Sequence, residues 1–526
     1  MIAPVEKSRE PDSSNEAKTE FSAAKRRAVA AGLVVFVIAI TIAVALRRKP
    51  AQAPSTTPQP IAVLPLQNTS DDKDLDFLRI GLADDIANTL SYYPAFSMRP
   101  FATTNHYSGA DVDLQKAARE MRVANIVTGH FVVAGDEVEV TLEAVDAANN
   151  QVLWRDSLQG ESGDLIGIQQ QIATRVQHGL VAALGVSADR GATSNVSHNA
   201  EAYELYLRAL SQGESASPDK SLGPSHRDAI QLLQRAVALD PGYASAWAAL
   251  GHFFYYESSV GQHGQAARLS AKAALQRAVA LDPNRVEAAS DLINIESEEG
   301  ELLRAYDDIS QLLQRRPESG AVHLVYSYVL WYAGLLNDAA TECDKTRSLD
   351  AGTTDLASCG YVYIAMGRYD RAREYLQLQA GNEYETAGEV EIDLREGRPD
   401  MALQDLNSLS MAFENGRQLL EPCLQHRQPT KQEVAATQRF RTGVMEEPDP
   451  GPKYLLAGWD SMCGQPDLAF RELSKAIEQD YCAYPQMETD PLLEKVRAAP
   501  QFAELRSSGI ACQQRFLEHK NGKNQK

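Results

Sequence analysis

AIQLLQRAVALDP at residues 229–241 and AKAALQRAVALDP at residues 271–283 are nearly identical, and they decide the fold of the larger part of the chain. Each stretch places small Ala residues at helical spacing and ends in Leu-Asp-Pro, which stops a helix because Pro cannot continue it. Self-similarity of this kind marks repeat architectures, in which each unit buries its apolar face against its neighbours. The sequence therefore predicts an all-α array of paired helices, in which these two stretches are second helices.

The segment between the two stretches matches the first helix of such a pair. Residues 247–254, WAALGHFF, are similar to the W-x-x-L-G-x-x-Y pattern of tetratricopeptide repeats, and an insertion around residues 258–265 lengthens this unit. Further units are marked by residues 283–317, 337–340, 368–372, 397–402 and 464–469. We predict a tetratricopeptide-like solenoid over residues 199–510, with about seven units that become degenerate between residues 375 and 450. The alternative is an unrelated α-helical bundle.

A solenoid of this class has a concave groove, and such grooves bind peptides or protein segments. The candidate groove residues are aromatic side chains on first helices: Tyr203, Tyr206, Tyr255 and Tyr363. Trp247 and Tyr326 lie on the same helices, but we expect them to pack in the core. Core packing is also the alternative for the four candidates.

Residues 61–186 show a different pattern upstream of the repeats. Residues 61–66, IAVLPL, are typical of a buried strand, and residues 74–91 place apolar residues at helical spacing. From residue 124 onward, alternating apolar and polar residues predict strands joined by turns, before an amphipathic helix over residues 165–184. The order strand, helix, strand, helix, three strands, helix indicates an α/β domain with a mixed sheet.

Several motifs of this domain resemble the TolB N-terminal-like family. They are IAVLPLQN at 61–68, GLADDIANTL at 81–90, ANIVTGHFVVAGD at 124–136 and VDAANNQVLW at 145–154. The resemblance implies a non-catalytic module of bacterial envelope or signalling proteins, often placed behind a transmembrane segment and ahead of tetratricopeptide repeats. Many members carry a DNA-binding, cyclase or kinase domain before the anchor, and this chain departs from them because only 27 residues precede its anchor.

The end of the chain also resembles these proteins. Residues 489–502, TDPLLEKVRAAPQF, are similar to the closing segment of bacterial TolB-like proteins with tetratricopeptide repeats. We expect this segment to cap the last apolar face of the solenoid, which would otherwise be exposed. Residues 511–526 are predicted to form a polar tail.

Residues 28–46, AVAAGLVVFVIAITIAVAL, contain no charged residue and predict a transmembrane helix. At about 1.5 Å per residue this stretch spans roughly 28 Å, close to the hydrocarbon thickness of a bilayer. The alternatives are a buried core helix and a cleaved signal peptide, but the run is longer than a signal h-region. Residues 1–27 are predicted to be a disordered cytoplasmic tail, and residues 47–60 a Pro-rich linker.

The charges around the anchor weakly favour an N-terminus inside the cell. Lys25, Arg26 and Arg27 precede the apolar stretch, and residues 47–49 add three basic residues after it. Widening the window adds Arg9 and Lys18 on the N-terminal side only, which favours that side as cytoplasmic. We therefore expect a single-pass protein of the bacterial inner membrane, with its C-terminal domains in the periplasm.

Charge and motifs argue against nucleic-acid binding and catalysis. Acidic residues outnumber basic ones by 71 to 51, whereas a phosphate-binding surface needs clustered Lys and Arg. No nucleotide-binding, zinc-protease or nucleophile-elbow motif is present, so we predict no catalytic residue, cofactor or metal. Residues 72–76 have the acidic spacing of a calcium loop, but Phe77 and Ala83 stand where such a loop needs Gly and Glu. His130 has no second ligand nearby and is expected to be structural.

All six cysteines lie in the last 184 residues, in the predicted repeats. If the repeats lie outside the cytoplasm, disulfides are possible. Cys343 on a second helix and Cys359 on the next first helix form the candidate pair, because these helices pack antiparallel. The alternative is that the cysteines are small buried core residues.

Together these features predict a non-enzymatic, membrane-anchored scaffold of the bacterial envelope that binds protein or peptide segments. A second hypothesis is a signalling protein that relays the state of the envelope to a cytoplasmic partner. The predicted contacts are with proteins and with the membrane through residues 28–46, not with nucleic acid. The sequence does not predict the oligomeric state or the identity of the partner.

Overall fold

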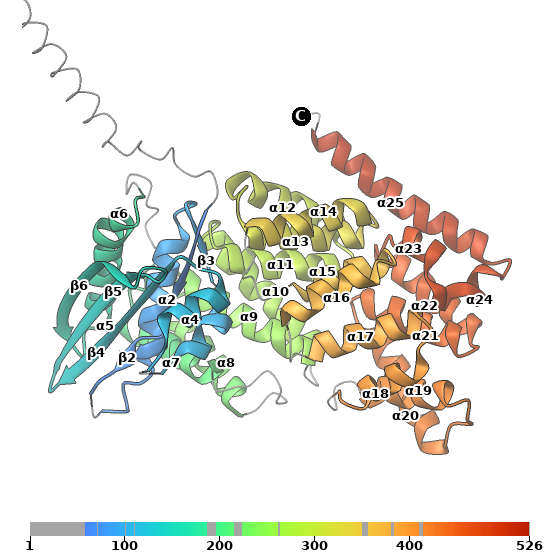
Figure 1. Ribbon diagram of the computed structural model, residues 1–526, viewed down its shortest axis with the longest axis horizontal. Coiled ribbons are helices and arrows are strands. Elements are labelled where there is room, and N and C mark those ends of the chain that lie inside the picture. Colours follow the sequence, from blue (N-terminus) through green and yellow to red (C-terminus); the bar gives the residue numbers. More distant parts are fainter. Residues whose placement is uncertain are drawn as a thin grey trace, which may run out of the picture. The chain divides into compact units, whose positions relative to one another are not determined.

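The computed structural model describes residues 58–70, 72–99, 101–109, 111–186, 196–214, 224–260, 264–349, 356–379, 383–409 and 414–524 (Figure 1). The predicted tail, the predicted anchor and most of the predicted linker lie outside these residues. Among the helices that are described, none is both long enough and apolar enough to cross a bilayer.

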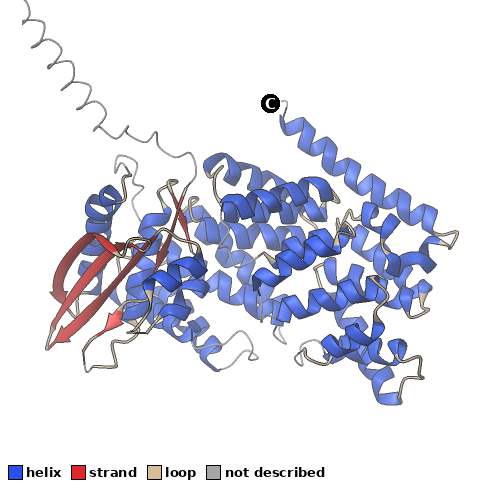
Figure 2. Ribbon diagram, viewed as in Figure 1, coloured by secondary structure: helices blue, strands red, loops and turns tan. Residues whose placement is uncertain are grey.

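A mixed sheet forms the N-terminal part of the described chain, as the sequence predicts (Figure 2). Its strands are β1 (Gln59–Val63), β2 (Gln67–Asn68), β3 (Phe96–Met98), β4 (Asn125–Ala134), β5 (Glu137–Asp146) and β6 (Gln151–Glu161). The order is β3-β1-β4-β5-β6, and β2 pairs with β4. The pairs of β1 with β3, β1 with β4 and β2 with β4 are parallel, whereas β4, β5 and β6 form an antiparallel meander.

The start of β1 corrects the predicted linker, which was expected to extend to residue 60. Gln59 and Pro60 are already in the strand, opposite Phe96 and Ser97 of β3. Pro60 is tolerated there because proline can occupy the beginning of a strand.

Helices cover both faces of the sheet. α2 (Leu78–Ser91) and α5 (Leu165–Arg175) pack on the face that carries Val127, Val140 and Leu142. α4 (Leu114–Met121) packs on the other face, against Ile126. The predicted helix over residues 165–184 contains a π-helical turn, Val176–Leu180, before α6 (Val181–Ala183). Two short helices, α3 (Phe101–Thr104) and η1 (Asn105–Tyr107), follow β3.

Eight helix pairs follow among the described residues. They are α7 (Ala200–Glu214) with α8 (Pro224–Leu239), α9 (Ala244–Val260) with α10 (Gly264–Leu281), α11 (Val286–Glu298) with α12 (Leu302–Arg315), α13 (Gly320–Tyr332) with α14 (Leu336–Leu349), α15 (Ala357–Ala365) with α16 (Tyr369–Leu376), α17 (Glu383–Arg395) with α18 (Pro399–Leu406), α19 (Glu414–Leu424) with α20 (Lys431–Glu446), and α21 (Gly451–Met462) with α22 (Pro466–Glu478). A short 3-10 turn, η3 (Gln377–Gln379), ends α16.

The turns inside these pairs explain their regularity. Gly300, Gly334, Gly367, Gly397 and Gly464 each follow the first helix of a pair and have positive φ. Glycine is the residue that adopts this conformation without strain, so it ends one helix and allows the next to turn back. The predicted insertion around residues 258–265 instead lengthens both helices of its pair, since residues 258–260 belong to α9 and residues 264–265 to α10.

The C-terminal part contains α23 (Tyr484–Thr489), η5 (Pro491–Leu493), α24 (Glu494–Arg497) and α25 (Phe502–Asn524). The prediction of a polar tail from residue 511 is therefore wrong as far as residue 524. Leu505, Cys512 and Phe516 form an apolar stripe at helical spacing, and all three are buried. Their burial accounts for the continuation of α25 from Phe502 through residues 511–524.

Candidate functional site

A buried polar contact joins α2 of the α/β domain to α7 of the first helix pair. The hydroxyl of Tyr203 donates to the carboxylate of Asp85, and the hydroxyl of Tyr206 donates to Asp84. Gln169 of α5 donates to Asp85 from the other side, with Nε2 2.7 Å from Oδ1. Both tyrosines are buried. The contact therefore fixes the first repeat against the sheet domain.

Burial changes the proton affinity of both carboxyl groups. Removal from water raises the pKa of Asp85 to about 7, against the hydrogen bonds from Tyr203 and Gln169 that favour the charged form. Burial also raises the pKa of Asp84. The junction consequently holds carboxyl groups that take up protons more readily than exposed ones.

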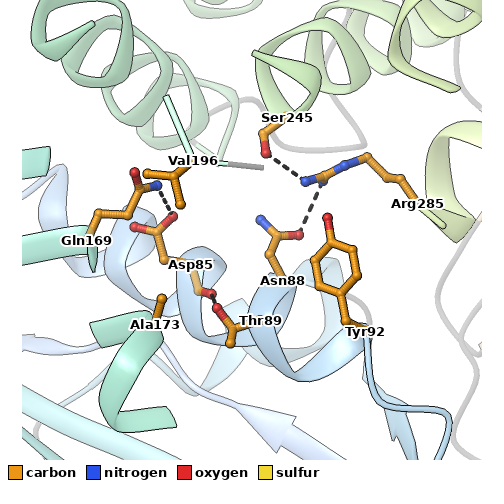
Figure 3. A pocket seen from close by; sticks show the side chains of 9 residues that line it. All are labelled: Asp85, Asn88, Thr89, Tyr92, Gln169, Ala173, Val196, Ser245 and Arg285. Atoms are coloured by element: carbon orange, nitrogen blue, oxygen red, sulfur yellow. Dashed lines mark hydrogen bonds between the residues drawn. The ribbon is translucent and has the colours of Figure 1, made fainter. Parts of the chain in front are cut away.

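A small polar pocket lies beside this contact (Figure 3). Its volume is about 310 Å³, including space that is open to solvent, and its lining residues are Asp85, Asn88, Thr89, Tyr92, Gln169, Ala173, Val196, Ser245 and Arg285. The guanidinium of Arg285 reaches across it and donates to Asn88 Oδ1 at 3.2 Å and to Ser245 Oγ at 2.6 Å.

The pocket contains buried polar groups that have no hydrogen-bond partner in the described part of the chain. Gln169 Oε1 and Arg285 Nε are buried without a hydrogen-bond partner among the described residues, although Nε lies 4.0 Å from the carboxylate of Asp282. The hydroxyl of Ser245 accepts from a guanidinium, which cannot act as a base because it stays protonated.

The structure corrects the prediction for the groove tyrosines. Tyr203, Tyr206 and Tyr363 are 0%, 2% and 2% exposed, so none of the three can line an accessible groove. The Tyr363 hydroxyl donates to Asp344 at 3.0 Å. Tyr255 is half-buried, and its hydroxyl donates to Glu298 at 2.8 Å. Each hydroxyl is paired inside the protein because a buried phenol needs a hydrogen-bond partner.

The two aromatic residues expected to pack in the core are also partly covered. Trp247 is half-buried and donates its indole N–H to the carbonyl oxygen of Pro241 at 3.1 Å. The ring of Tyr326 lies 6.3 Å from that of Tyr306.

A second cluster lies on first helices in the middle of the array. We call Tyr255, Glu298, Tyr328, Trp331 and Tyr332 the repeat wall; they come from α9, α11 and α13. Both Tyr255 and Tyr328 donate to Glu298 Oε1, at 2.8 and 3.1 Å, and the hydroxyls of Tyr328 and Tyr332 are 2.8 Å apart. Arg268 of α10 forms an ion pair with Glu298. Tyr255, Glu298, Tyr328 and Tyr332 thus form a continuous hydrogen-bonded row, and the ring of Trp331 packs against Tyr328 with centroids 5.8 Å apart.

The chain itself covers this wall. Asp449, which precedes α21, accepts a hydrogen bond from the Tyr332 hydroxyl at 2.8 Å. The ring of Tyr481 packs edge-on against Tyr332, with centroids 5.1 Å apart, and the amide of Cys482 donates to the Tyr332 carbonyl at 2.8 Å. The surface expected to form an open groove is therefore filled here by residues from the end of the chain.

Burial shifts the pKa values of ionisable groups that lie between the repeat wall and the residues that cover it. Burial raises the pKa of Glu298 to about 7 and also raises the pKa of Asp449. Burial lowers the pKa of Lys453 to about 8; its ammonium donates to the Asp449 carbonyl at 2.9 Å.

The six cysteines form three pairs. Cys343 and Cys359, the candidate pair, have their Cα atoms 5.7 Å apart and are joined between α14 and α15. The sequence did not predict the other two pairs, Cys423 with Cys463 and Cys482 with Cys512. Their separations of 40 and 30 residues carry no local signal, because both pairs depend on how the end of the chain folds back.

The residues considered for metal binding do not converge in the described part of the chain, where no group of three or more His, Cys, Asp or Glu side chains is placed to hold a metal ion. Asp76 accepts a hydrogen bond from Asn68, and Asp72 accepts one from the amide of Asp74. His130 lies in β4, opposite Thr141 of β5.

One region of the chain is similar to a known protein family. Residues 57–175 match the profile of the second domain of HilA/YgeH-like transcriptional regulators. The chain is also 25% identical over 190 residues to "Putative adenylate cyclase 3" of Rhizobium meliloti (strain 1021). That match covers 36% of this chain and 32% of the relative, so the chain spans about a third of the length of that curated protein.

Solved structures of tetratricopeptide repeat proteins are similar to this chain at low identity. A tetratricopeptide repeat protein from Parabacteroides merdae is 14% identical, with 57% of this chain and 100% of that chain covered and a TM-score of 0.31. Yeast Tom70 is 15% identical, with 66% and 75% covered and a TM-score of 0.33. Because both scores are low, the assignment of stacked helix pairs rests on the helices described above.

A structure of lipoprotein GNA1162 from Neisseria meningitidis is also similar to part of the chain. It is 20% identical, and the match covers 23% of this chain and 99% of that chain with a TM-score of 0.20. A score this low supports no functional transfer.

Proposed function

We propose that this protein is a non-enzymatic, membrane-anchored scaffold that binds protein segments in the bacterial envelope. The observation that carries the proposal is the stack of eight helix pairs, because such stacks present long surfaces that suit protein partners. The net charge of −20 favours solubility and protein partners over nucleic acid. The activity of the similar cyclase is not carried over, since the match spans only a third of that protein.

The proposed location is the inner membrane, with the repeats in the periplasm. Its supports are the uncharged stretch at residues 28–46 and three cysteine pairs, which suit an oxidising compartment. A C-terminal reporter that works only outside the cytoplasm should be active. A silent reporter in a stable, membrane-inserted fusion would contradict the orientation.

The α/β domain is proposed to be a TolB N-terminal-like module beside the bilayer. The motifs quoted above and the mixed sheet with helices on both faces are consistent with it. The match of residues 57–175 to a regulator domain names a different family, so the two assignments compete. For this chain we propose that the domain is a non-catalytic spacer between the anchor and the repeats.

Chemical crosslinking in intact membranes, followed by capture of the full-length chain, tests the scaffold function. We expect one or a few envelope proteins to be recovered in constant ratio to the bait. Recovery of chaperones alone would contradict the proposal. A chain whose repeats have been replaced by an unrelated helical domain is the control.

The second candidate function is relay of envelope state through the anchor. The buried contact of Asp84 and Asp85 with Tyr206 and Tyr203 favours it, because it couples the repeats to the domain next to the anchor. Replacing residues 1–46 with an unrelated tail and anchor separates the two functions. Scaffolding predicts that partner capture and any downstream response both survive the exchange, whereas relay predicts that the downstream response is lost.

A further inference from the structure

The three disulfides differ in their exposure to solvent. Two of them are shut off from solvent, because each of their four residues is at most 1% exposed: Cys343, Cys359, Cys482 and Cys512. Cys423 and Cys463, in contrast, are only half-buried. Disulfide exchange begins when a thiolate attacks one of the two sulfur atoms, so its rate depends on access to them. In the folded protein, Cys423–Cys463 is the accessible disulfide.

The chain around this accessible disulfide leaves room for an approaching molecule. Cys423 is next to the last residue of α19, and Cys463 directly follows α21. The next residue, Gly464, is exposed, and among the described atoms a Cβ at this position would meet only Lys495 Nζ, at 4.0 Å. At Gly334, beside one of the buried disulfides, a Cβ would lie 2.1 Å from a carbonyl oxygen. The turn at Gly464 therefore leaves space for the thiol of a second protein.

The charges beside the two sulfur atoms are unequal. Both cysteines lie at the C-terminus of a helix, where the carbonyl groups disfavour a negative thiolate. At the end of α21, the ammonium of Lys495 donates to the Met462 carbonyl at 2.9 Å, directly before Cys463, and it forms no ion pair with a described carboxylate. Arg427, which follows α19, is instead neutralised by an ion pair with Glu433. A nearby cation favours a thiolate, so Cys463 is the better leaving group and Cys423 the sulfur that is attacked.

The helices that this disulfide joins are also held together without it. Leu420 of α19 is buried in a small apolar core with Val444 of α20 and Leu456 of α21. Arg441 of α20 donates from Nε to Oδ2 of the buried Asp460 of α21, at 2.8 Å. These contacts do not involve sulfur, so α19, α20 and α21 remain packed when the disulfide is reduced.

We propose that Cys423–Cys463 is a thiol–disulfide exchange site whose partner is a dithiol oxidoreductase. The partner's thiolate attacks Cys423 Sγ, the S–S bond breaks, and Cys463 leaves as a thiolate that takes up a proton. The partner's second thiolate then attacks the partner's own sulfur in the mixed disulfide and releases Cys423, which is protonated in turn. The partner supplies both electrons and both protons and becomes a disulfide, while this chain gains two thiols. The inference goes beyond the scaffold function and rests on the proposed oxidising compartment, in which such disulfides form.

The test uses the full-length chain, purified in detergent without reductant, and reduced thioredoxin as the probe. Samples are quenched with acid at intervals, and the new thiols are labelled with a maleimide and located by mass spectrometry. Cys423 and Cys463 should be reduced at least about tenfold faster than the four buried cysteines. The double variant Cys423→Ala, Cys463→Ala should acquire no label in the same time. The circular dichroism of the wild-type chain should not change when this one disulfide is reduced.

A thioredoxin whose second active-site cysteine is replaced by serine cannot complete the exchange, and it should be trapped as a mixed disulfide on Cys423. Lys495→Gln should slow the reduction about threefold, and Lys116→Gln, on exposed α4, should not. Equal reduction of all three disulfides, or trapping on a buried cysteine, would overturn the inference. Trapping on Cys463, or an unchanged rate in Lys495→Gln, would overturn the assigned direction of attack. Partner capture from membranes does not depend on these results, so the scaffold function stands or falls separately.

Discussion

At the scale of the residue, Asp85 is the clearest case of a side chain whose chemistry is set by burial. Its pKa is about 7 in the folded protein and 3.8 in an exposed carboxyl group, so the folded state binds more protons between these values. The contribution of Asp85 to the free energy of unfolding is then fully present below about pH 4, and it is lost as the pH rises through 7. Acidic conditions therefore favour the junction between α2 and α7.

The substitution Asp85→Asn tests the direction of this pH dependence of stability. The amide keeps an oxygen for Tyr203, and Gln169 can turn its unpaired Oε1 toward the new N–H group. We expect Asp85→Asn to raise the free energy of unfolding at pH 8 by on the order of 2 kcal/mol, with little change at pH 4. Urea unfolding at both pH values measures it. Exposed Asp136→Asn is the control, and a variant less stable than wild type at pH 8 would refute the prediction.

Spacing along the sequence located the tyrosines on the correct helices but not their environment. Tyr203 and Tyr206 lie on α7, a first helix, as expected, yet their hydroxyls meet Asp85 and Asp84 of a different domain. Helical periodicity shows which residues share a face, but the partner of that face depends on contacts more than 100 residues away. Two adjacent acids in the middle of α2 were the available signal.

At the scale of the element, glycines and the Leu-Asp-Pro stops made the helix pairs predictable. The regular turn glycines and the repeated second-helix sequence each act locally, within one pair. The degenerate region between residues 375 and 450 still forms two pairs, α17 with α18 and α19 with α20. Packing between neighbouring pairs supplies what the local sequence lacks.

The C-terminal helix provides a stability prediction at this scale. Phe516 is 1% exposed, and its ring lies 5.2 Å from that of Tyr306 on α12. Phe516→Ala should lower the free energy of unfolding by about 3 kcal/mol, because a large side chain leaves a cavity. Gln514→Ala, on the exposed side of the same helix, should change it by less than about 0.5 kcal/mol. Similar effects of the two substitutions would show that residues 511–524 are a tail after all.

The cysteine pairs give a prediction that links elements to the compartment. Protein extracted from membranes without reductant and then denatured should show no reactive thiol, and six after reduction, because all six cysteines are paired. Thiol titration with a chromogenic disulfide measures this. Six free thiols before reduction would contradict both the pairing and the periplasmic location proposed above.

At the scale of the whole molecule, the sequence predicted the class of architecture. It did not predict that the end of the chain covers the repeat wall. A mixed sheet domain followed by helix pairs follows from hydrophobic periods that alternate between strand and helix. The covering of the repeat wall by Asp449 and Tyr481 could not be predicted, since it joins parts of the chain over 100 residues apart. The sequence predicts an open groove, but residues from the end of the chain cover the repeats at Tyr332 of α13.

The central claim is that the repeats bind protein segments in the envelope. Site-specific photo-crosslinking in intact cells tests it most directly, with a photoreactive residue placed in turn at Tyr328 of the wall and at Gln314 on the exposed side of α12. In the full-length chain, we predict a discrete crosslinked partner from position 328 and none from position 314. The absence of any adduct from position 328, in a chain that is folded and inserted in the membrane, would contradict the account.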